Sequence, residues 1–257
     1  MQINKSFINT YGRHNIDLNK KLEKKITNSL CENLITDGKV CKKFESKIAT
    51  KTKSKFSVVC NSGTSALMMS ILSLDVKNLV VIIPNINFVA AANIVLLLKG
   101  KIILCDVNKD NGMVDYENFV EALSFCKKKK LKPNLFISVD FAGDVMDLSK
   151  ISKLCKKKDI TIIDDGCHSF GSYKKIKRKK IIVGQNQYSK MTTFSFHPVK
   201  NLTTIEGGAI TTNSKKIYDK LLLLRSHNLK KTSITDPYKL INPSLNFRLG
   251  EINALIG

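Results

Sequence analysis

Residues 79–106 read LVVIIPNINFVAAANIVLLLKGKIILCD, in which two short apolar runs flank a longer apolar segment. Leu79–Ile83 and Lys101–Asp106 have the length of strands, and Val89–Leu98 has the length of a helix. A strand, a helix of about ten residues and a second strand are typical of a βαβ unit with parallel strands. This stretch therefore predicts an α/β fold.

The same alternation extends in both directions along the chain. Further strands are predicted at 57–60, 135–139, 161–164, 190–196 and 208–212, and further helices at 65–74, 116–126, 148–157 and 215–225. Residues 1–55 are predicted to form a helical N-terminal segment, with Asp37-Gly38 marking a turn between two helices. We expect a mostly parallel central sheet with helices on both faces.

Composition excludes several classes of protein. The 257 residues include 43 Lys plus Arg against 21 Asp plus Glu, which gives a net charge of +22, and 43% of them are hydrophobic. That hydrophobic content argues against a disordered polymer. No apolar run approaches the ~18 residues of a membrane span, and the N-terminus lacks the apolar centre of a signal peptide. We expect a soluble, cytoplasmic protein without membrane contact.

The cysteine and lysine patterns bear on disulfide, metal and nucleic-acid sites. The seven cysteines are odd in number and include no C-x-x-C pair, so neither a disulfide framework nor a metal site is expected. The basic runs Lys127–Lys130, Lys156–Lys158 and Lys174–Lys180 can be either a solvated surface or a patch for phosphate-bearing ligands. Because no zinc finger or aromatic RNA-binding motif accompanies them, no nucleic-acid partner is predicted.

Polar segments follow the predicted strands. Ligands of open parallel sheets bind beyond the carboxyl ends of the strands, which here are residues 61–65, 85–88, 140–143, 164–168 and 195–200. The small residues Asn61–Ser65 open a helix, so they can cradle an anion or simply cap the helix. These two interpretations remain open from the residues alone.

Three further candidates are chemically reactive. Asp164 and Asp165 end an apolar strand, where a carboxylate can hold a protonated ring nitrogen, bind a metal, act as a base or cap the next helix. His168 lies in the polar loop that follows, where it can be structural or catalytic. Lys200 lies in a loop after another strand and is either an amine nucleophile or one more surface lysine.

Taken together and in this order, these segments resemble the DegT/DnrJ/EryC1/StrS family of sugar aminotransferases. The resemblance runs from Ile35 to the end of the chain. Its most specific parts are Asn61–Leu67, Ile163–Gly171, Phe194–Lys200 and Glu206–Gly208, and Leu224–His227 and Asn246–Arg248 also match. It implies the fold of aspartate aminotransferase (fold type I), with residues 56–245 as a domain that binds pyridoxal 5′-phosphate.

The resemblance also implies roles for individual residues. Lys200 matches the lysine that forms a Schiff base with the cofactor, Asp165 the carboxylate that pairs with the pyridine nitrogen, and His168 a group near the ring oxygen. The expected phosphate cradle is formed by Gly63, Thr64 and Ser195. Phe88 is expected to stack on the pyridine ring, and Asn246 to reach the active site of the neighbouring subunit.

The implied activity is a ping-pong transfer of an amino group from an amino acid, with glutamate expected, to a keto nucleotide sugar. Val139–Gly143 and His197–Lys200 resemble the subgroup that aminates C4 of a UDP-4-keto-6-deoxy-N-acetylhexosamine. A homodimer is expected. The alternatives are a dehydratase of the same fold, which typically has His in place of Lys200, and a non-catalytic remnant that acts as a binding protein.

The sequence departs from the family pattern at its C-terminus. Family members continue through a small domain, whereas residues 246–257 are only the start of that region, so we expect a truncated product or a second chain that carries the remainder. Asn228 stands where the family usually has Gly, and Asn87 where it often has Thr. The first change removes a residue that adopts positive φ without strain.

Overall fold

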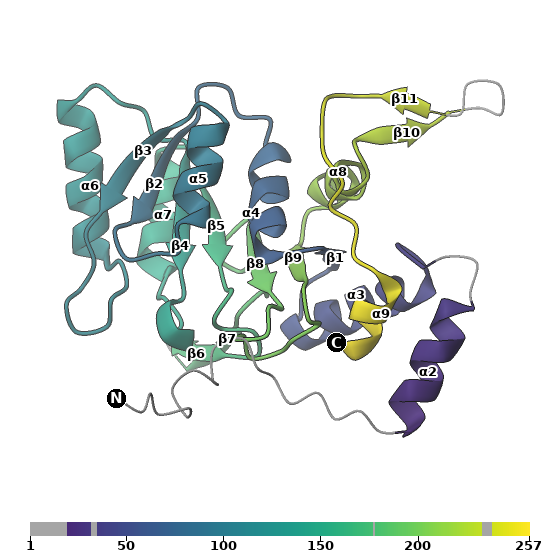
Figure 1. Cartoon of the computed structure of the whole chain (residues 1–257). Helices are drawn as coiled ribbons and strands as arrows, with labels where there is room; N and C mark the ends of the chain where they lie inside the picture. The colour runs from purple at the N-terminus through teal and green to yellow at the C-terminus, as the bar shows by residue number, and fades with distance from the viewer. Residues whose placement is uncertain (1–19, 32–34, 177, 233–237) are drawn as a thin grey trace, which may run out of the picture.

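The computed structural model describes residues 20–31, 35–176, 178–232 and 238–257. Its centre is a seven-stranded sheet in the order β1-β9-β8-β5-β4-β2-β3, in which β9 runs antiparallel to the other strands (Figure 1). These strands are β1 (Phe56–Cys60), β2 (Val80–Pro84), β3 (Lys101–Cys105), β4 (Leu135–Val139), β5 (Thr161–Asp165), β8 (Met191–Ser195) and β9 (Gly208–Thr212).

Helices cover both faces of the sheet. On one face lie α4 (Gly63–Leu72), α5 (Ala90–Leu97) and α8 (Lys215–Arg225), and on the other α6 (Tyr116–Lys128) and α7 (Ser149–Lys157). Within β2, Val81 and Ile83 join the core on the first face, whereas Val80 and Ile82 join the core on the second. Side chains of a strand alternate between the faces, so the continuous apolar run of β2 is what a strand buried on both sides requires.

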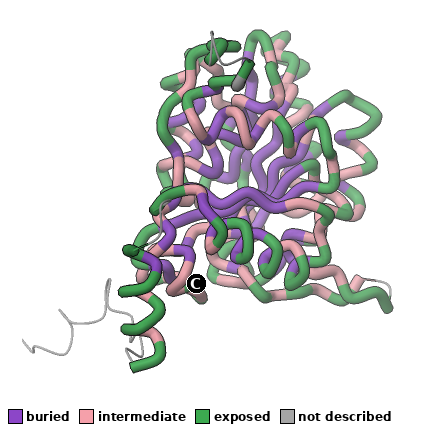
Figure 2. The backbone as a smooth tube through the Cα atoms, turned by 90° about the vertical axis from the view of Figure 1, so that its right-hand side faces the viewer, coloured by how far each residue is buried: buried purple, intermediate pink, exposed green. Residues whose placement is uncertain are grey.

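The helical N-terminal part packs beside β1. The helices α3 (Lys39–Thr52) and α9 (Glu251–Ile256) contribute to a third apolar cluster with Phe194 and Phe196, and α2 (Lys20–Leu30) lies against α9. Figure 2 shows the buried strands running through the middle of the molecule, with exposed loops and helices around them. The first and last described segments of the chain therefore meet at one end of the sheet.

From residue 56 to residue 225 the predicted elements agree with the observed ones to within about two residues. Of the predicted helical segment 1–55, residues 1–19 and 32–34 lie outside the described residues. Two hairpins and a short helix were not predicted: β6 (Tyr173–Ile176) with β7 (Lys179–Ile182), β10 (Leu229–Lys231) with β11 (Tyr238–Leu240), and η1 (Phe141–Gly143). Half of the residues in the strands of the first hairpin are lysines that stand in adjacent pairs, so these strands lack the regular apolar alternation of a strand. Asn228 keeps a positive φ of 58°, a conformation that asparagine tolerates better than most residues.

Three other observations bear on the sequence predictions. All seven cysteines are free thiols, five of them buried in the core. None of the helices in the described part of the chain is long and apolar enough to cross a membrane. Within the same residues, no cluster of three or more His, Cys, Asp or Glu side chains could hold a metal ion.

Candidate active site

The start of α4 meets the end of β8. Ser62 caps the helix, its hydroxyl accepting a hydrogen bond from the Ser65 N–H at 3.0 Å. The N–H groups of Gly63 and Thr64, at the first two helical positions, have no acceptor within the helix. A Cβ on Gly63 would lie 2.7 Å from the Ser195 Cβ, so only glycine allows this contact. The resulting corner combines free N–H groups, a helix N-terminus and a hydroxyl, which suits a phosphate group.

The motif Glu206-Gly207-Gly208 belongs to the same corner. A Cβ on Gly208 would lie 2.3 Å from the Ser62 carbonyl oxygen, and one on Gly207 would lie 2.2 Å from the Thr204 Oγ1. Gly208 therefore permits the close approach of β9 to the turn before α4, and Gly207 permits the close approach of the Thr204 side chain within the preceding loop. The motif was identified in the sequence only by its resemblance to the family, and the structure shows why two glycines are needed there.

The two carboxylates at the end of β5 lie on opposite faces of the sheet. Asp164 is buried, and its Oδ1 accepts a hydrogen bond from the Ser138 hydroxyl at 2.7 Å. Burial raises its pKa well above the ordinary value, and the nearby Asp140 carboxylate adds to the effect. Asp165 is only partly buried, and its Oδ1 accepts the Cys167 N–H at 3.1 Å. Of the pair, Asp165 is thus the carboxylate that is accessible to a ligand.

His168 and Lys200 lie close enough to interact electrostatically. Burial lowers the pKa of His168, the Lys200 ammonium lowers it further, and Asp165 acts in the opposite direction. The imidazole is consequently neutral at neutral pH, with one nitrogen donating and the other accepting. In the described part of the chain, the Lys200 Nζ has neither a hydrogen-bond partner nor an ion pair, so its amine is not committed to a structural contact.

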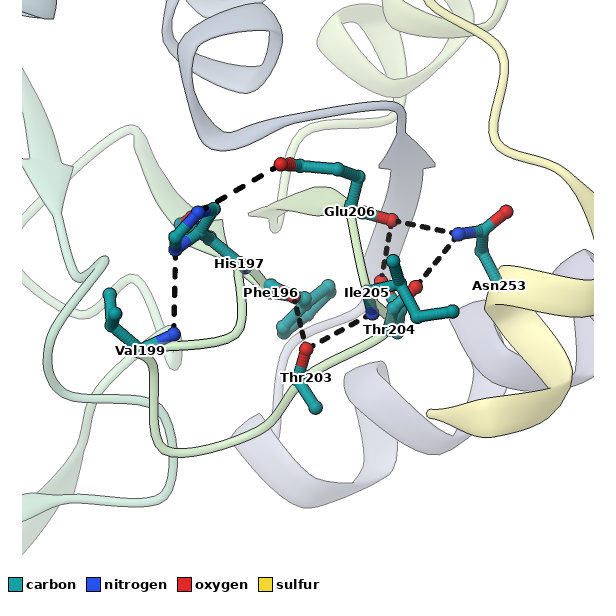
Figure 3. Close-up of polar contacts among 9 residues, drawn as sticks. Phe196, His197, Val199, Thr203, Thr204, Ile205, Glu206 and Asn253 are labelled. Carbon is teal, nitrogen blue, oxygen red and sulfur yellow. Dashed lines mark hydrogen bonds and ion pairs between the residues drawn. The ribbon is translucent and has the colours of Figure 1, made fainter. Parts of the chain in front are cut away.

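The loop from Phe196 to Gly207 carries Lys200 and is held by its own polar contacts (Figure 3). The Thr203 hydroxyl donates to the Phe196 carbonyl and accepts from the Ile205 N–H, both at 3.0 Å. The Asn253 side chain of α9 donates to the Thr204 carbonyl at 2.8 Å. Ile205 has a φ of 71°, an outlier for a β-branched residue, which these contacts hold in place. The loop that positions Lys200 is thereby anchored to the C-terminal helix.

Phe88 and Asn246 lie at the margins of this region. Phe88 follows β2 and is 69% exposed, in agreement with a ring that has no partner within the described chain. The exposed Asn246 accepts the Arg248 N–H on its Oδ1 at 3.1 Å, and its carbonyl accepts from the Asn61 side chain at 3.4 Å. Thr64 is also exposed.

Two side chains to which the sequence analysis assigned no role of their own contact the site loops. The Asn201 amide donates to the carbonyls of His168 and Phe170, at 3.2 and 3.3 Å. The buried Asp140 accepts from the Ser169 hydroxyl at 2.6 Å. Asn201 directly follows Lys200, and Asp140 ends β4, but nothing in the chain's pattern indicates which distant loop each contacts.

The arrangement can be tested against a phosphorylated pyridine aldehyde, the cofactor that the resemblance implies. A Cβ at Gly63 would fill the anion corner, an accessible carboxylate ends β5, and an uncommitted amine lies near a neutral imidazole. Each reactive part of the cofactor thus has a group of matching chemistry at the same edge of the sheet. The residues fit it.

Comparison with known proteins agrees with this geometry. A family model described as "DegT/DnrJ/EryC1/StrS aminotransferase family" matches residues 17–257. Among curated proteins, the chain is 33% identical over 248 residues to a UDP-4-amino-4,6-dideoxy-N-acetyl-beta-L-altrosamine transaminase of Campylobacter jejuni, covering 96% of the chain and 62% of the relative. It is 32% identical to the Helicobacter pylori transaminase of the same name, over 93% and 61%.

Solved structures show the same fold. Helicobacter pylori PseC, an aminotransferase involved in the biosynthesis of pseudoaminic acid, superposes with a TM-score of 0.79 at 29% identity, over 93% of this chain and 62% of that one. A PLP form of the putative sugar aminotransferase Spr1654 from Streptococcus pneumoniae gives 0.79 at 24% identity, over 94% and 63%. The predicted fold class is confirmed. The chain spans about three fifths of the length of these relatives.

Proposed function

Because the chain belongs to the DegT/DnrJ/EryC1/StrS aminotransferase family, we propose that it binds pyridoxal 5′-phosphate and transfers an amino group from glutamate to a keto nucleotide sugar. The observation that carries the proposal is that Asp165 and Lys200 both act on the pKa of His168, at the edge of the sheet where Ser195 also meets the start of α4. The names of the related transaminases support an acceptor that carries its keto group at C4 of a UDP-4-keto-6-deoxy-hexosamine.

Each residue then has a separate task. The cofactor supplies an aldehyde that takes up the amino group and a ring that accepts electrons. Asp165 accepts a hydrogen bond from the ring nitrogen and keeps it protonated, while His168 binds the ring oxygen. Lys200 would provide the amine that holds the cofactor covalently, and once released its Nζ would carry a proton between the substrate carbon and the cofactor carbon within each half-reaction.

The remaining contacts keep the cofactor in place while its covalent attachment is exchanged. The N–H groups of Gly63 and Thr64 and the Ser195 hydroxyl bind the phosphate, as the corner at α4 allows. Phe88 covers the face of the ring and excludes water from it. Because these residues do not change charge during the reaction, they bind and orient the cofactor without transferring protons.

A homodimer is the second part of the proposal. Exposed apolar side chains gather on α5 and on the segments next to it: Ile86, Phe88, Val89, Leu96, Leu97 and Leu104. A patch of this kind on a monomer marks an interaction site, and in this family a second copy is the expected occupant. The partner's copy of Asn246 would then reach the phosphate. We also propose a cytoplasmic location, which seven free cysteines support.

The decisive experiment is an absorption spectrum of the purified chain with added pyridoxal 5′-phosphate, beside its Lys200→Ala variant. A visible band that depends on Lys200 and bleaches on adding glutamate is expected. A sugar dehydratase of this fold is disfavoured because its relatives typically have His at this position. A folded protein without the band would refute the proposal and favour a binding protein without catalysis.

A further inference from the structure

Asp140 is a buried carboxylate to which the proposed reaction assigns no task. It lies just after β4 and is 1% exposed. Its Oδ1 accepts the Met146 N–H at 2.9 Å, and its Oδ2 accepts the Ser169 hydroxyl at 2.6 Å. A buried carboxylate is costly unless hydrogen bonds compensate it, and an apolar side chain of similar size would fill the space without that cost. The presence of a carboxylate at this buried position therefore calls for an explanation other than packing.

Asp140 contacts the candidate site at two points. Its backbone N–H donates to the Asp165 carbonyl at 3.1 Å, which fixes it to the end of β5. Its carboxylate holds Ser169, the residue that directly follows His168. One residue thus connects the strand end that carries Asp165 with the turn that carries His168.

The turn between these contacts is compact. The Ser169 N–H donates to the Gly166 carbonyl at 3.0 Å, and Ser169 is completely buried. On its outer side, the Asn201 amide holds the His168 carbonyl, and a Cβ on Gly143 would lie 3.2 Å from the same oxygen. The turn is therefore fixed from the Lys200 loop on one side and from Asp140 on the other.

We propose that Asp140 and Ser169 form a positioning pair that holds the Gly166–Ser169 turn so that His168 faces Lys200 and Asp165. This inference rests on the proposed function, because the value of a fixed His168 lies in its contact with the cofactor. Asp140 touches no reacting atom and acts through Ser169. Burial raises its pKa to about 6 against the hydrogen bonds from Ser169 and Met146, so it is largely ionised at neutral pH and accepts both bonds.

The test measures the imidazole titration of His168 by NMR in the cofactor-free chain, with the resonance assigned from a His168→Gln spectrum. Ser169→Ala removes the hydrogen bond without changing any charge. If the pair positions His168, release of the turn exposes the imidazole and separates it from Lys200, so its pKa rises toward 6.5. An unchanged titration in Ser169→Ala would overturn the proposal, as would an unfolded Ser169→Ala chain, which would show a general structural role.

Asp140→Asn separates positioning from a direct effect of charge. Loss of a nearby negative charge would by itself lower the pKa of His168 further, whereas release of the turn raises it. We expect the rise, and a fall would overturn the proposal. Asp144→Asn removes an exposed carboxylate from the same loop and should leave His168 unchanged.

Cofactor affinity gives the second readout. Both variants of the pair should weaken pyridoxal 5′-phosphate binding by about threefold to tenfold, the range of one hydrogen bond, while Asp144→Asn keeps the original affinity. If the parent chain does not bind the cofactor, the proposed function fails, yet the His168 titration still decides whether the pair positions this residue. Equal affinities in all three variants of a binding-competent chain would count against the pair.

Discussion

Two polar regions of the molecule place cations near carboxylates but differ in how far their groups are paired. Between α8 and α3, the Arg225 guanidinium lies 2.7 Å from Glu45 and 2.5 Å from Asp37, and Glu45 also accepts the Val59 N–H. At the carboxyl edge of the sheet, Lys200 and Asp165 both act electrostatically on His168, and the Lys200 Nζ has no hydrogen bond or ion pair to any described residue.

This difference in pairing distinguishes charged groups that stabilise the fold from charged groups that are available to a ligand. In the Arg225 cluster, Nη1 pairs with Glu45 and Nη2 with Asp37. The Arg225 Nε is the one buried side-chain nitrogen or oxygen atom in the described ranges that lacks a hydrogen-bond partner, so the cluster is nearly but not fully paired within the chain. Within the residues that the structure describes, the edge has a lysine amine and two backbone N–H groups without a partner, and an exposed aromatic ring. Groups paired internally stabilise the fold, and groups left open bind what the chain does not contain.

The largest expected effect comes from breaking the saturated cluster. Arg225→Leu leaves Glu45 buried without its cation, and removal of one partner from a buried ion pair costs about 3–5 kcal/mol. Burial already raises the pKa of Glu45, although Arg225 opposes the shift. Urea unfolding should show this loss, while Lys200→Ala in the same assay should remain within about 0.5 kcal/mol of the parent chain. A larger loss for Lys200→Ala than for Arg225→Leu would reverse the comparison.

A smaller loss is expected at the contact between α9 and α3. The Glu251 carboxylate accepts the N–H groups of Gly38, Val40 and Cys41 at 2.7–3.0 Å and so caps α3. Burial raises its pKa, but the hydrogen bonds from Cys41, Val40 and Gly38 outweigh burial, and the net pKa is lowered. Glu251→Gln should cost about 1–3 kcal/mol of unfolding free energy at neutral pH.

The pH dependence follows from the sign of that shift. A carboxylate with a lowered pKa stabilises the fold above its ordinary pKa of 4.5, and the contribution is lost as pH falls through the folded-state value. The difference between the parent chain and Glu251→Gln should therefore shrink below pH 4.5. The control is Glu117→Gln, which removes an acidic side chain from the first turn of α6. A difference that grows in acid would contradict the capping role.

The sequence predicts the carboxyl edge of the sheet better than it predicts the Arg225 cluster. The strand and helix pattern of residues 79–106 is a local property, and it predicted β2, α5 and β3 closely. The candidate site residues follow strands, so topology alone gathers them at one edge. The Arg225–Glu45 pair joins residues 180 positions apart, and the sequence analysis named the segment around Arg225 only as one that resembles the family. Periodicity carries no signal for such pairs, or for the contact of Asp140 with Ser169.

An intermediate effect is expected where the open corner meets the core. In Gly63→Ala, the new Cβ would lie 2.7 Å from the Ser195 Cβ, so the helix start or β8 must move. We expect a loss of about 1–3 kcal/mol in stability and weaker cofactor binding, measured by urea unfolding and absorption titration. Adding Ser195→Gly removes the Cβ in the way and should restore stability but not affinity, because the hydroxyl is also lost. Restoration of both would show that the Ser195 hydroxyl does not bind the phosphate.

The smallest effect on folding, and the sharpest test of the open edge, is expected for Phe88→Ala. A side chain that is 69% exposed contributes little to the core, so the unfolding free energy should change by less than about 0.5 kcal/mol. If its ring covers the cofactor, binding should weaken by about twofold to tenfold, the range of one aromatic stacking contact, and Phe88→Tyr should retain the affinity.

Phe125→Ala is the matched control for this last change, because Phe125 is 48% exposed on α6, outside the edge. Both alanine variants remove an exposed ring, so any effect of surface hydrophobicity alone appears equally in both titrations. Weakened binding confined to Phe88→Ala would mean that the Phe88 ring contacts the cofactor. Equal binding in the two variants would mean that Phe88, like Phe125, is a surface residue without a contact to the cofactor. Fewer groups at the edge would then bind the cofactor than the geometry indicates.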